Sequence, residues 1–262
     1  MKIKKILLKL GNMFADALYV EHIKCLNCGK DLPKQNIYDI CDKCKEDLAF
    51  NNGRRCMRCG KNLIGEANYC FACKNTERHF DKAVTPFLYS GIVAKLIKRF
   101  KYNNSPYLAK TFAKWLAQEY AKSDFEVDIV VPVPMHEKKL KKRGYNQAEL
   151  LAIEFCKITK LPLDTTHLIK KIDLETQTHK SYDERAKVED IYALTEKKYF
   201  RGKKVLVIDD VITTGATLDA CAKTLNASKV YCLAVANTRT RIKKVENNEK
   251  LKEKKFRKKI AI

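Results

Sequence analysis

The residues with the clearest chemical potential lie in one run, Val205–Leu218, with the sequence Val-Leu-Val-Ile-Asp-Asp-Val-Ile-Thr-Thr-Gly-Ala-Thr-Leu. Its first four residues are apolar and predict a strand buried on both faces. Asp209 and Asp210 follow at once, and a small hydroxyl-rich loop then leads into a helix predicted over 218–226. A helix start offers free N–H groups to a phosphate, and carboxylates accept hydrogen bonds from ribose hydroxyls. The run therefore predicts a site for a phosphorylated sugar, with a ligand-borne Mg²⁺ beside the carboxylates.

The same residues also fit a simpler interpretation, in which a buried strand is followed by a surface turn and a capped helix. Their order favours the ligand site, because ligands bind at the carboxyl ends of parallel strands. The run is neither a Walker loop nor a G-x-G-x-x-G motif. It resembles the phosphoribosyl pyrophosphate (PRPP) motif of type I phosphoribosyltransferases. That resemblance implies a PRPP–Mg²⁺ site at Asp209, Asp210, Thr213, Thr214, Gly215, Ala216 and Thr217.

A second candidate segment follows the apolar run Asp128–Pro134, which predicts another buried strand. Proline lacks the N–H of a central ladder, so the chain must leave the sheet at Pro132 and Pro134. The next segment, 135–144, is predicted to be a loop and holds five Lys or Arg residues. A solvated basic loop would also account for this charge, but its place at a strand end favours a phosphate site. Arg143 is the residue best suited to hold a phosphate through two hydrogen bonds.

The order of the elements predicts an α/β fold with a mostly parallel sheet and helices on both faces. Gly144 would allow a sharp turn after the basic segment, and Asn146 would cap the helix that follows. Strands are expected at 81–90, 128–134, 168–172, 205–208 and 229–236, and helices at 92–102, 107–121, 146–159 and 218–226.

Eight of the eleven cysteines form four C-x-x-C pairs, separated by 12, 11 and 10 residues. Two such pairs can place four thiolates on one Zn²⁺ in a tetrahedral site. The spacing predicts two consecutive ribbons with structural zinc, and crossed pairing of the four units stays open. The expected ligands are Cys25, Cys28, Cys41 and Cys44 in the first site, and Cys56, Cys59, Cys70 and Cys73 in the second.

Disulfides are the main alternative for these eight cysteines, and the lack of a recognisable signal peptide argues against them. A redox role is less favoured, because the four C-x-x-C motifs do not lie in a thioredoxin-like setting. The remaining cysteines, Cys156, Cys221 and Cys232, lie in apolar segments and are expected to be packing residues.

These motifs together resemble the ComF/ComFC family of competence-associated, phosphoribosyltransferase-like proteins, over about residues 23 to 238. The resemblance rests on Pro132-Val133-Pro134 with His136, on Arg143-Gly-Tyr-Asn-Gln-Ala148, and on Leu96-Ile97 with Phe100-Lys101-Tyr102. Gln177, Ser181 and Arg185 also match, but the asparagine usual after them in the family is absent. The resemblance implies a small double zinc ribbon before a type I phosphoribosyltransferase-like domain, and it makes Pro132, Val133 and Pro134 the pyrophosphate loop.

Four parts are expected: an amphipathic N-terminal helix (1–20), a double zinc ribbon (21–76), a phosphoribosyltransferase-like domain (80–238) and a basic tail (239–262). The N-terminal helix fits packing on the protein better than lying on a membrane surface. The tail carries eleven Lys or Arg residues against three Glu, which suits a solubilising segment as well as a nucleic-acid arm. No segment has transmembrane length, and a cytoplasmic protein is expected.

The formal net charge of +22 favours polyanionic partners. Our first hypothesis is a PRPP-site protein that binds single-stranded DNA during natural transformation, with other competence proteins as further partners. Tyr102, Tyr107 and Tyr145 lie near basic runs, where they fit either packing or stacking on bases. The alternative is an active phosphoribosyltransferase that displaces pyrophosphate from PRPP, or uses another phosphorylated ribose. The sequence identifies no general base, so no catalytic residue is predicted.

Overall fold

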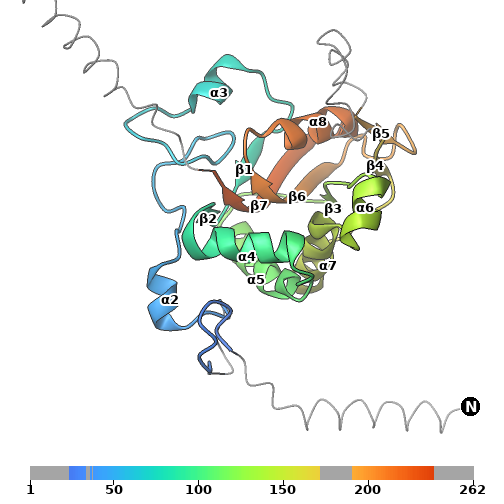
Figure 1. Cartoon of the computed structure of the whole chain (residues 1–262). Coiled ribbons are helices and arrows are strands. Elements are labelled where there is room, and N and C mark those ends of the chain that lie inside the picture. The colour runs from blue at the N-terminus through green and yellow to red at the C-terminus, as the bar shows by residue number, and fades with distance from the viewer. Residues whose placement is uncertain (1–23, 34–35, 37, 172–190, 239–262) are drawn as a thin grey trace, which may run out of the picture.

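The apolar segments of the C-terminal two thirds of the chain assemble into one parallel sheet. The computed structural model describes residues 24–33, 36, 38–171 and 191–238. Four strands follow the order β1-β7-β6-β3, and β2 also pairs with β7 (Figure 1). The bounds are β1 (Lys82–Val84), β2 (Phe87–Leu88), β3 (Ile129–Pro132), β6 (Lys204–Ile212) and β7 (Lys229–Asn237).

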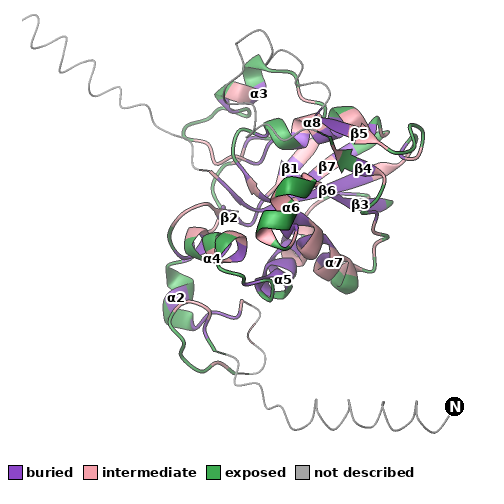
Figure 2. Ribbon diagram, turned by 45° about the vertical axis from the view of Figure 1, so that its right-hand side comes forward, coloured by how far each residue is buried: buried purple, intermediate pink, exposed green. Residues whose placement is uncertain are grey.

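The centre of the sheet is formed by β6 and β7, which pair in parallel from Lys204 opposite Lys229 to Ile212 opposite Asn237. On the other side of β6, Pro132 of β3 lies opposite Ile208. The strands are buried between layers of helices, as the colouring of Figure 2 shows. Near-continuous apolar runs of this kind are typical of parallel strands that are covered on both faces.

Three helices cover one face of the sheet (Figure 1). In the first of them, buried apolar residues recur at helical spacing from Ile92 to Phe100, while Lys95 and Lys98 face solvent. These side chains pack with Leu206 and Ile208 of β6, so this helix has a fixed position beside the strand. The helices are α4 (Gly91–Tyr102), α5 (Leu108–Ala121) and α7 (Gln147–Thr159).

The opposite face is covered by α8 (Ala216–Leu225), which packs its apolar side on the alternate residues of β6 and β7. A two-stranded antiparallel sheet, β4 (Leu168–Lys170) with β5 (Tyr192–Leu194), packs beside it. The expected α/β class, with a mostly parallel sheet and helices on both faces, is therefore confirmed.

The expectations for the strands at 168–172 and 81–90 were wrong. The strand expected at 168–172 does not join the parallel sheet, because its partner is the short segment β5, which the sequence pattern did not reveal. The strand expected at 81–90 is divided into β1 and β2. Pro86 separates them, because proline has no N–H to donate to a neighbouring strand. The Pro86 carbonyl accepts a hydrogen bond from the backbone N–H of Asn51, which lies outside the sheet.

The cysteine-rich segment contains two very short helices, α2 (Asp42–Glu46) and α3 (Phe71–Asn75), each beginning directly after a cysteine. Its second half is joined to the sheet by backbone and side-chain hydrogen bonds. Ala83 of β1 donates to the carbonyl of Arg58, and the Asn237 amide donates to the carbonyl of Cys59. The segment is therefore anchored on the edge of the same sheet (Figure 1).

Several expected features lie outside the described residues: the N-terminal helix at 1–20, the basic tail at 239–262, and the segment with Gln177, Ser181 and Arg185. Among the helices that the structure does describe, none combines the length and the apolar character needed to cross a membrane.

Candidate functional site

A pocket of about 390 Å³ opens where β3 and β6 end. We call it the strand-end pocket. Its wall includes Val133 and Pro134 after β3, Asp209 and Asp210 on β6, and Thr217 at the start of α8. Because β3 and β6 are parallel neighbours, their carboxyl ends bring together residues that lie far apart in the sequence.

The acidic pair lies within β6 and not after it. The strand was expected to end at Ile208, but it pairs with β7 as far as Ile212. Consecutive residues of a strand point to opposite faces, so the two carboxylates have different surroundings. Asp210 forms an ion pair with Lys101 of α4, with 2.9 Å between Nζ and Oδ1, whereas Asp209 Oδ1 accepts the backbone N–H of Asp210 at 2.8 Å.

The electrostatics of the pair follow from this difference. Burial, and then the charge of Asp210, raise the pKa of the Asp209 carboxyl to about 7. Burial alone would lower the pKa of the Lys101 ammonium, but its contact with Asp210 outweighs that effect and raises the pKa above its ordinary value. The pocket thus holds an ion pair beside a carboxyl group that changes its charge near neutral pH.

The opposite wall is cationic and comes from a helix. The segment 135–144 was expected to be a loop, but residues Glu137–Arg143 form the short helix α6. His136 caps it by accepting the Lys138 N–H, and Gly144 ends it in a left-handed conformation with φ of 86°. Lys and Arg are good helix formers, which explains why a run of cations is helical here.

Two cations of α6, Lys139 and Arg143, line the strand-end pocket. Arg143 Nη1 donates to Gln147 Oε1 at 2.6 Å, which fixes the guanidinium against the start of α7. Gln147 is buried, and its Nε2 has no hydrogen-bond partner among the described residues. The wall thus offers a held guanidinium and an unused amide donor.

Asn146 connects the two sides of this wall. Its Oδ1 caps α7 by accepting the Ala148 N–H, as the sequence predicted, and its Nδ2 donates to the carbonyl of Val133. One buried amide therefore fixes the loop after β3 to the helix that follows α6.

The loop between β6 and α8 is held by one residue that follows the cysteine module and by one residue that follows β7. Arg78 Nη2 donates to the carbonyl of Thr214 at 2.8 Å, and Thr238 Oγ1 donates to the carbonyl of Thr213. Gly215 has φ of 80°, a conformation that side chains rarely adopt, and it forms the N-cap of α8. The carbonyls of the loop point toward these donors, while Thr213 and Thr217 face the pocket.

The cysteine sulfurs gather in two groups, each with all four atoms within 4.8 Å of one another. The groups are the two consecutive tetrads that the spacing predicted, so the pairing is not crossed. Sulfur atoms lie 3.6 Å apart between Cys28 and Cys41, and between Cys59 and Cys70. Four thiolates at about 2.3 Å from a tetrahedral Zn²⁺ have about this spacing, so both donor sets fit structural zinc.

Comparison with family models adds to this geometry. A phosphoribosyl transferase domain model matches residues 101–259, which is more than half of the chain. The chain belongs to the phosphoribosyl transferase domain family. A double zinc ribbon domain model matches residues 14–74. The two matched domain models, together with relatives named competence protein F and competence protein ComFC, make it a member of the ComF/ComFC family.

Three curated relatives illustrate the family. Competence protein F of Haemophilus influenzae is 29% identical over 215 residues, covering 78% of this chain and 91% of the relative. Competence protein ComFC of Bacillus subtilis is 26% identical over 193 residues, covering 71% and 77% respectively. DNA utilization protein YhgH of Escherichia coli K12 is 23% identical over 207 residues, covering 75% and 90%.

Solved structures also resemble the chain. A glutamine PRPP amidotransferase from B. subtilis matches 50% of the chain with 25% sequence identity and a TM-score of 0.36, and the match spans only 26% of that enzyme. A hypoxanthine phosphoribosyltransferase from Staphylococcus aureus matches 53% of the chain and 70% of its own length, with 14% identity and a TM-score of 0.31.

In this phosphoribosyl transferase family member, the pocket gathers most of the site residues that the sequence predicted. The predicted residues on its wall are Val133, Pro134, Arg143, Asp209, Asp210, Thr213 and Thr217. Pro132, Thr214, Gly215 and Ala216 are not part of the wall. Pro132 is buried inside β3, and Thr214, Gly215 and Ala216 form the turn that supports the start of α8.

Other wall residues of the strand-end pocket were missed. Lys101 was noted only as part of a motif, while Tyr89, Lys139, Lys170 and Tyr192 were not assigned to the site. Burial raises the pKa of Tyr192 far above its ordinary value, so this phenol stays neutral at physiological pH. The density of cations in 138–143 was a usable signal for Lys139, whereas nothing local in the sequence marked Tyr89 or Tyr192.

Proposed function

We propose that the chain binds PRPP with Mg²⁺ in the strand-end pocket and acts in competence by handling single-stranded DNA during uptake. The observation that carries the proposal is the division of the pocket into two chemically opposite sides. Asp209 and Asp210 lie on β6, and Lys139 and Arg143 lie on α6. PRPP has the complementary division, because ribose hydroxyls donate hydrogen bonds and pyrophosphate attracts cations. The relatives named as competence proteins support the biological setting.

Each wall then has a role toward the ligand. Thr213 and Thr217, at the start of α8, suit the phosphate on the ribose. Arg143 and the unused Gln147 amide suit the pyrophosphate. The carboxylates would lie beside the Mg²⁺ that the ligand brings, and that ion would neutralise pyrophosphate charge.

The test of PRPP binding is isothermal titration calorimetry on the zinc-loaded chain, with and without Mg²⁺. We expect Mg²⁺-dependent binding to the wild type and much weaker binding to Asp210→Asn, which loses the carboxylate paired with Lys101. If the wild type shows no Mg²⁺-dependent binding, the PRPP assignment is wrong.

The proposed DNA handling rests on charge. The chain has a formal net charge of +22. Lysine and arginine side chains line the strand-end pocket, and α6 beside it is rich in them. Binding of a single strand should therefore weaken steeply with salt, because each neutralised phosphate releases counterions. Filter binding between about 50 and 200 mM salt tests this, and affinity that does not respond to salt would contradict it.

A second candidate function, phosphoribosyl transfer, is favoured by one observation. Asp209 has a pKa of about 7 and lines the same pocket, so it can accept a proton near neutral pH. Transfer would break the bond between the anomeric carbon and pyrophosphate, form a bond to a nucleophile, and pass the nucleophile's proton to the carboxylate. Release of pyrophosphate in the presence of ammonia or nucleobases tests it, and its absence with every acceptor would leave only the binding function.

We also propose the division of the chain into a double zinc ribbon at 21–76 and a phosphoribosyltransferase-like domain at 80–238. The matched ranges of the two family models support this division. Arg78 and His79 lie between the two parts and bond to the start of α8, so we infer that the junction is tightly held.

A further inference from the structure

A second hollow lies next to the strand-end pocket. It has a volume of about 580 Å³ and is lined by Lys101, Tyr102, Asn104, Lys139, Lys142, Arg143 and Tyr145. We call it the tyrosine groove. Four of these seven residues are cationic and none is acidic. A surface of this composition attracts an extended polyanion.

The groove also presents an aromatic face. Tyr102 ends α4 with 71% of its surface exposed, which is unusual for a large side chain. The Arg143 guanidinium lies 5.2 Å from the centre of its ring, so the ring is held beside a cation. Tyr145 is different, because its ring packs at a tilt against Phe100 and its hydroxyl donates to the Phe100 carbonyl. Tyr102 is therefore the ring available for stacking, and Tyr145 supports the floor.

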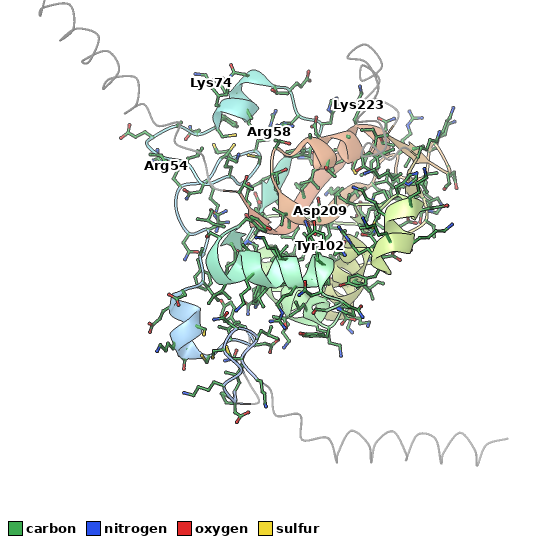
Figure 3. All side chains as sticks on the ribbon, in the orientation of Figure 1. Arg54, Arg58, Lys74, Tyr102, Asp209 and Lys223 are labelled. Carbon is green, nitrogen blue, oxygen red and sulfur yellow. The ribbon has the colours of Figure 1, made fainter. Side chains whose placement is uncertain are left out.

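The groove and the strand-end pocket share three cations: Lys101, Lys139 and Arg143. The other four residues of the groove, Tyr102, Asn104, Lys142 and Tyr145, do not line the strand-end pocket. Figure 3 labels Tyr102 at the end of α4 and Asp209 on β6, one from each hollow. The two hollows thus form one continuous cationic surface with an acidic end and an aromatic end.

We propose that the tyrosine groove is the binding site for single-stranded nucleic acid, with a base stacked on Tyr102 and phosphates on Lys142 and the shared cations. This inference rests on the proposed function and locates its DNA-binding part. Stacking on an exposed ring together with a cationic track is how proteins bind single strands without sequence preference.

A consequence concerns regulation. PRPP would place its pyrophosphate on Arg143 and Lys139. The single-stranded nucleic acid would place its phosphates on the same two side chains, so the two ligands compete. By thermodynamic linkage, PRPP–Mg²⁺ weakens strand binding by the same factor by which the strand weakens PRPP binding. Binding of PRPP–Mg²⁺ in the strand-end pocket thereby promotes release of the single-stranded nucleic acid from the tyrosine groove.

The test uses fluorescence anisotropy of a labelled oligothymidylate of about 20 nucleotides with the full, zinc-loaded chain. Calorimetry with PRPP–Mg²⁺ runs in parallel on every variant. Tyr102→Ala should weaken oligonucleotide binding from about fivefold to about a hundredfold, the range of one lost base stack, and Tyr102→Phe should retain affinity. Tyr102 is exposed at a helix end, so both variants keep the core intact.

Two adjacent lysines of α6 give a matched pair. Lys142→Ala should weaken oligonucleotide binding and reduce the slope of log affinity against log salt by about 0.7, the value for one phosphate on a single strand. Lys141→Ala should leave the slope unchanged, because Lys141 is exposed and does not line the groove. Both lysine variants should bind PRPP–Mg²⁺ like the wild type, and saturating PRPP–Mg²⁺ should weaken oligonucleotide binding.

The outcomes separate the two proposals. If the wild type binds the oligonucleotide but Tyr102→Ala and Lys142→Ala bind it equally well, the groove assignment is overturned while the proposed function stands. If the wild type binds both ligands without competition, the shared-cation argument is overturned. If the wild type binds neither ligand, the proposed function and this inference fail together.

Discussion

Lys101 Nζ lies 2.9 Å from Asp210 Oδ1, and this contact joins the last turn of α4 to the central strand β6. Both side chains are largely buried, with 23% and 10% of their surfaces exposed. A lysine from a helix on one face of the sheet thus reaches the strand ends on which the candidate site is built. The pair sets the charge of the pocket before any ligand binds.

Replacement of Lys101 by Met should therefore affect both stability and binding. We expect the free energy of unfolding to fall by about 1–3 kcal/mol, because Asp210 is left as an uncompensated charge with little solvent. Affinity for PRPP–Mg²⁺ should also fall, since a cation shared by both hollows is lost. Urea denaturation and calorimetry measure the two effects. Lys98→Met, at an exposed position on the same helix, is the control and should change neither.

The two cysteine tetrads should hold two zinc ions, and loss of each should loosen a different part of the molecule. The first tetrad is tied to α4, because Arg99 Nη1 donates to the Leu26 carbonyl. The second is tied to β1 and β7 through the carbonyls of Arg58 and Cys59. Cys44→Ser and Cys73→Ser should each leave one zinc per chain.

Hydrogen exchange measures the separate effects of these two substitutions. Cys44→Ser should speed exchange mainly in α4, and Cys73→Ser mainly in β1 and β7, because each loses the anchor described above. Zinc content by atomic absorption confirms the loss of one ion. The same exchange pattern in both variants would contradict the separate anchoring of the tetrads.

The sequence was most informative where the determinants are local. The run from Val205 to Leu218 contains its strand, loop and helix start in consecutive residues, so the pattern predicted this local structure, and the phosphate site there stays a prediction. The cysteine tetrads were predictable for a similar reason, because the C-x-x-C spacing limits which sulfurs can meet.

Elements that depend on distant partners were not predictable. Lys101 enters the pocket only because α4 packs against β6, and no feature near Lys101 indicates this position. β4 leaves the parallel sheet because it pairs with β5, a strand of three residues. In α6 the error was different: the density of charge suggested a loop, although the cap at His136 and the stop at Gly144 were present in the sequence.

Arg78 should be needed to position the loop between β6 and α8, although it does not line the pocket. Its guanidinium holds the Thr214 carbonyl, and hydrogen bonds from charged donors contribute about 1.5–3 kcal/mol. Arg78→Ala should therefore weaken PRPP–Mg²⁺ binding by about tenfold or more, and Arg78→Lys should recover part of that loss. Calorimetry provides the measurement. Arg54→Ala, in the ribbon that precedes Arg78, is the control, since the Arg54 side chain is exposed and bonds only weakly, at 3.5 Å, to the Gly65 carbonyl.

Asp209 should make the stability of the ligand-free protein depend on pH. Burial and the charge of Asp210 raise its pKa to about 7 in the folded state, whereas an unfolded aspartate has a pKa of about 3.9. At a pH between these two pKa values, the Asp209 carboxyl is ionised in the unfolded chain and protonated in the folded protein. The stability contributed by the neutral carboxyl is therefore complete below about pH 4 and is lost as the pH rises through about 7.

Asp209→Asn keeps a neutral side chain at every pH and should remove this loss. Relative to the wild type, the variant should gain free energy of unfolding as the pH rises from about 5.5 to about 8, by an amount on the order of 2 kcal/mol. Urea denaturation in Mg²⁺-free buffer at both pH values measures the difference. Asp219→Asn is a useful comparison, because Asp219 lies outside the pocket wall beside His79. If the difference in free energy of unfolding between Asp209→Asn and the wild type does not change with pH, Asp209 is ionised in the folded protein throughout this range and the prediction is wrong.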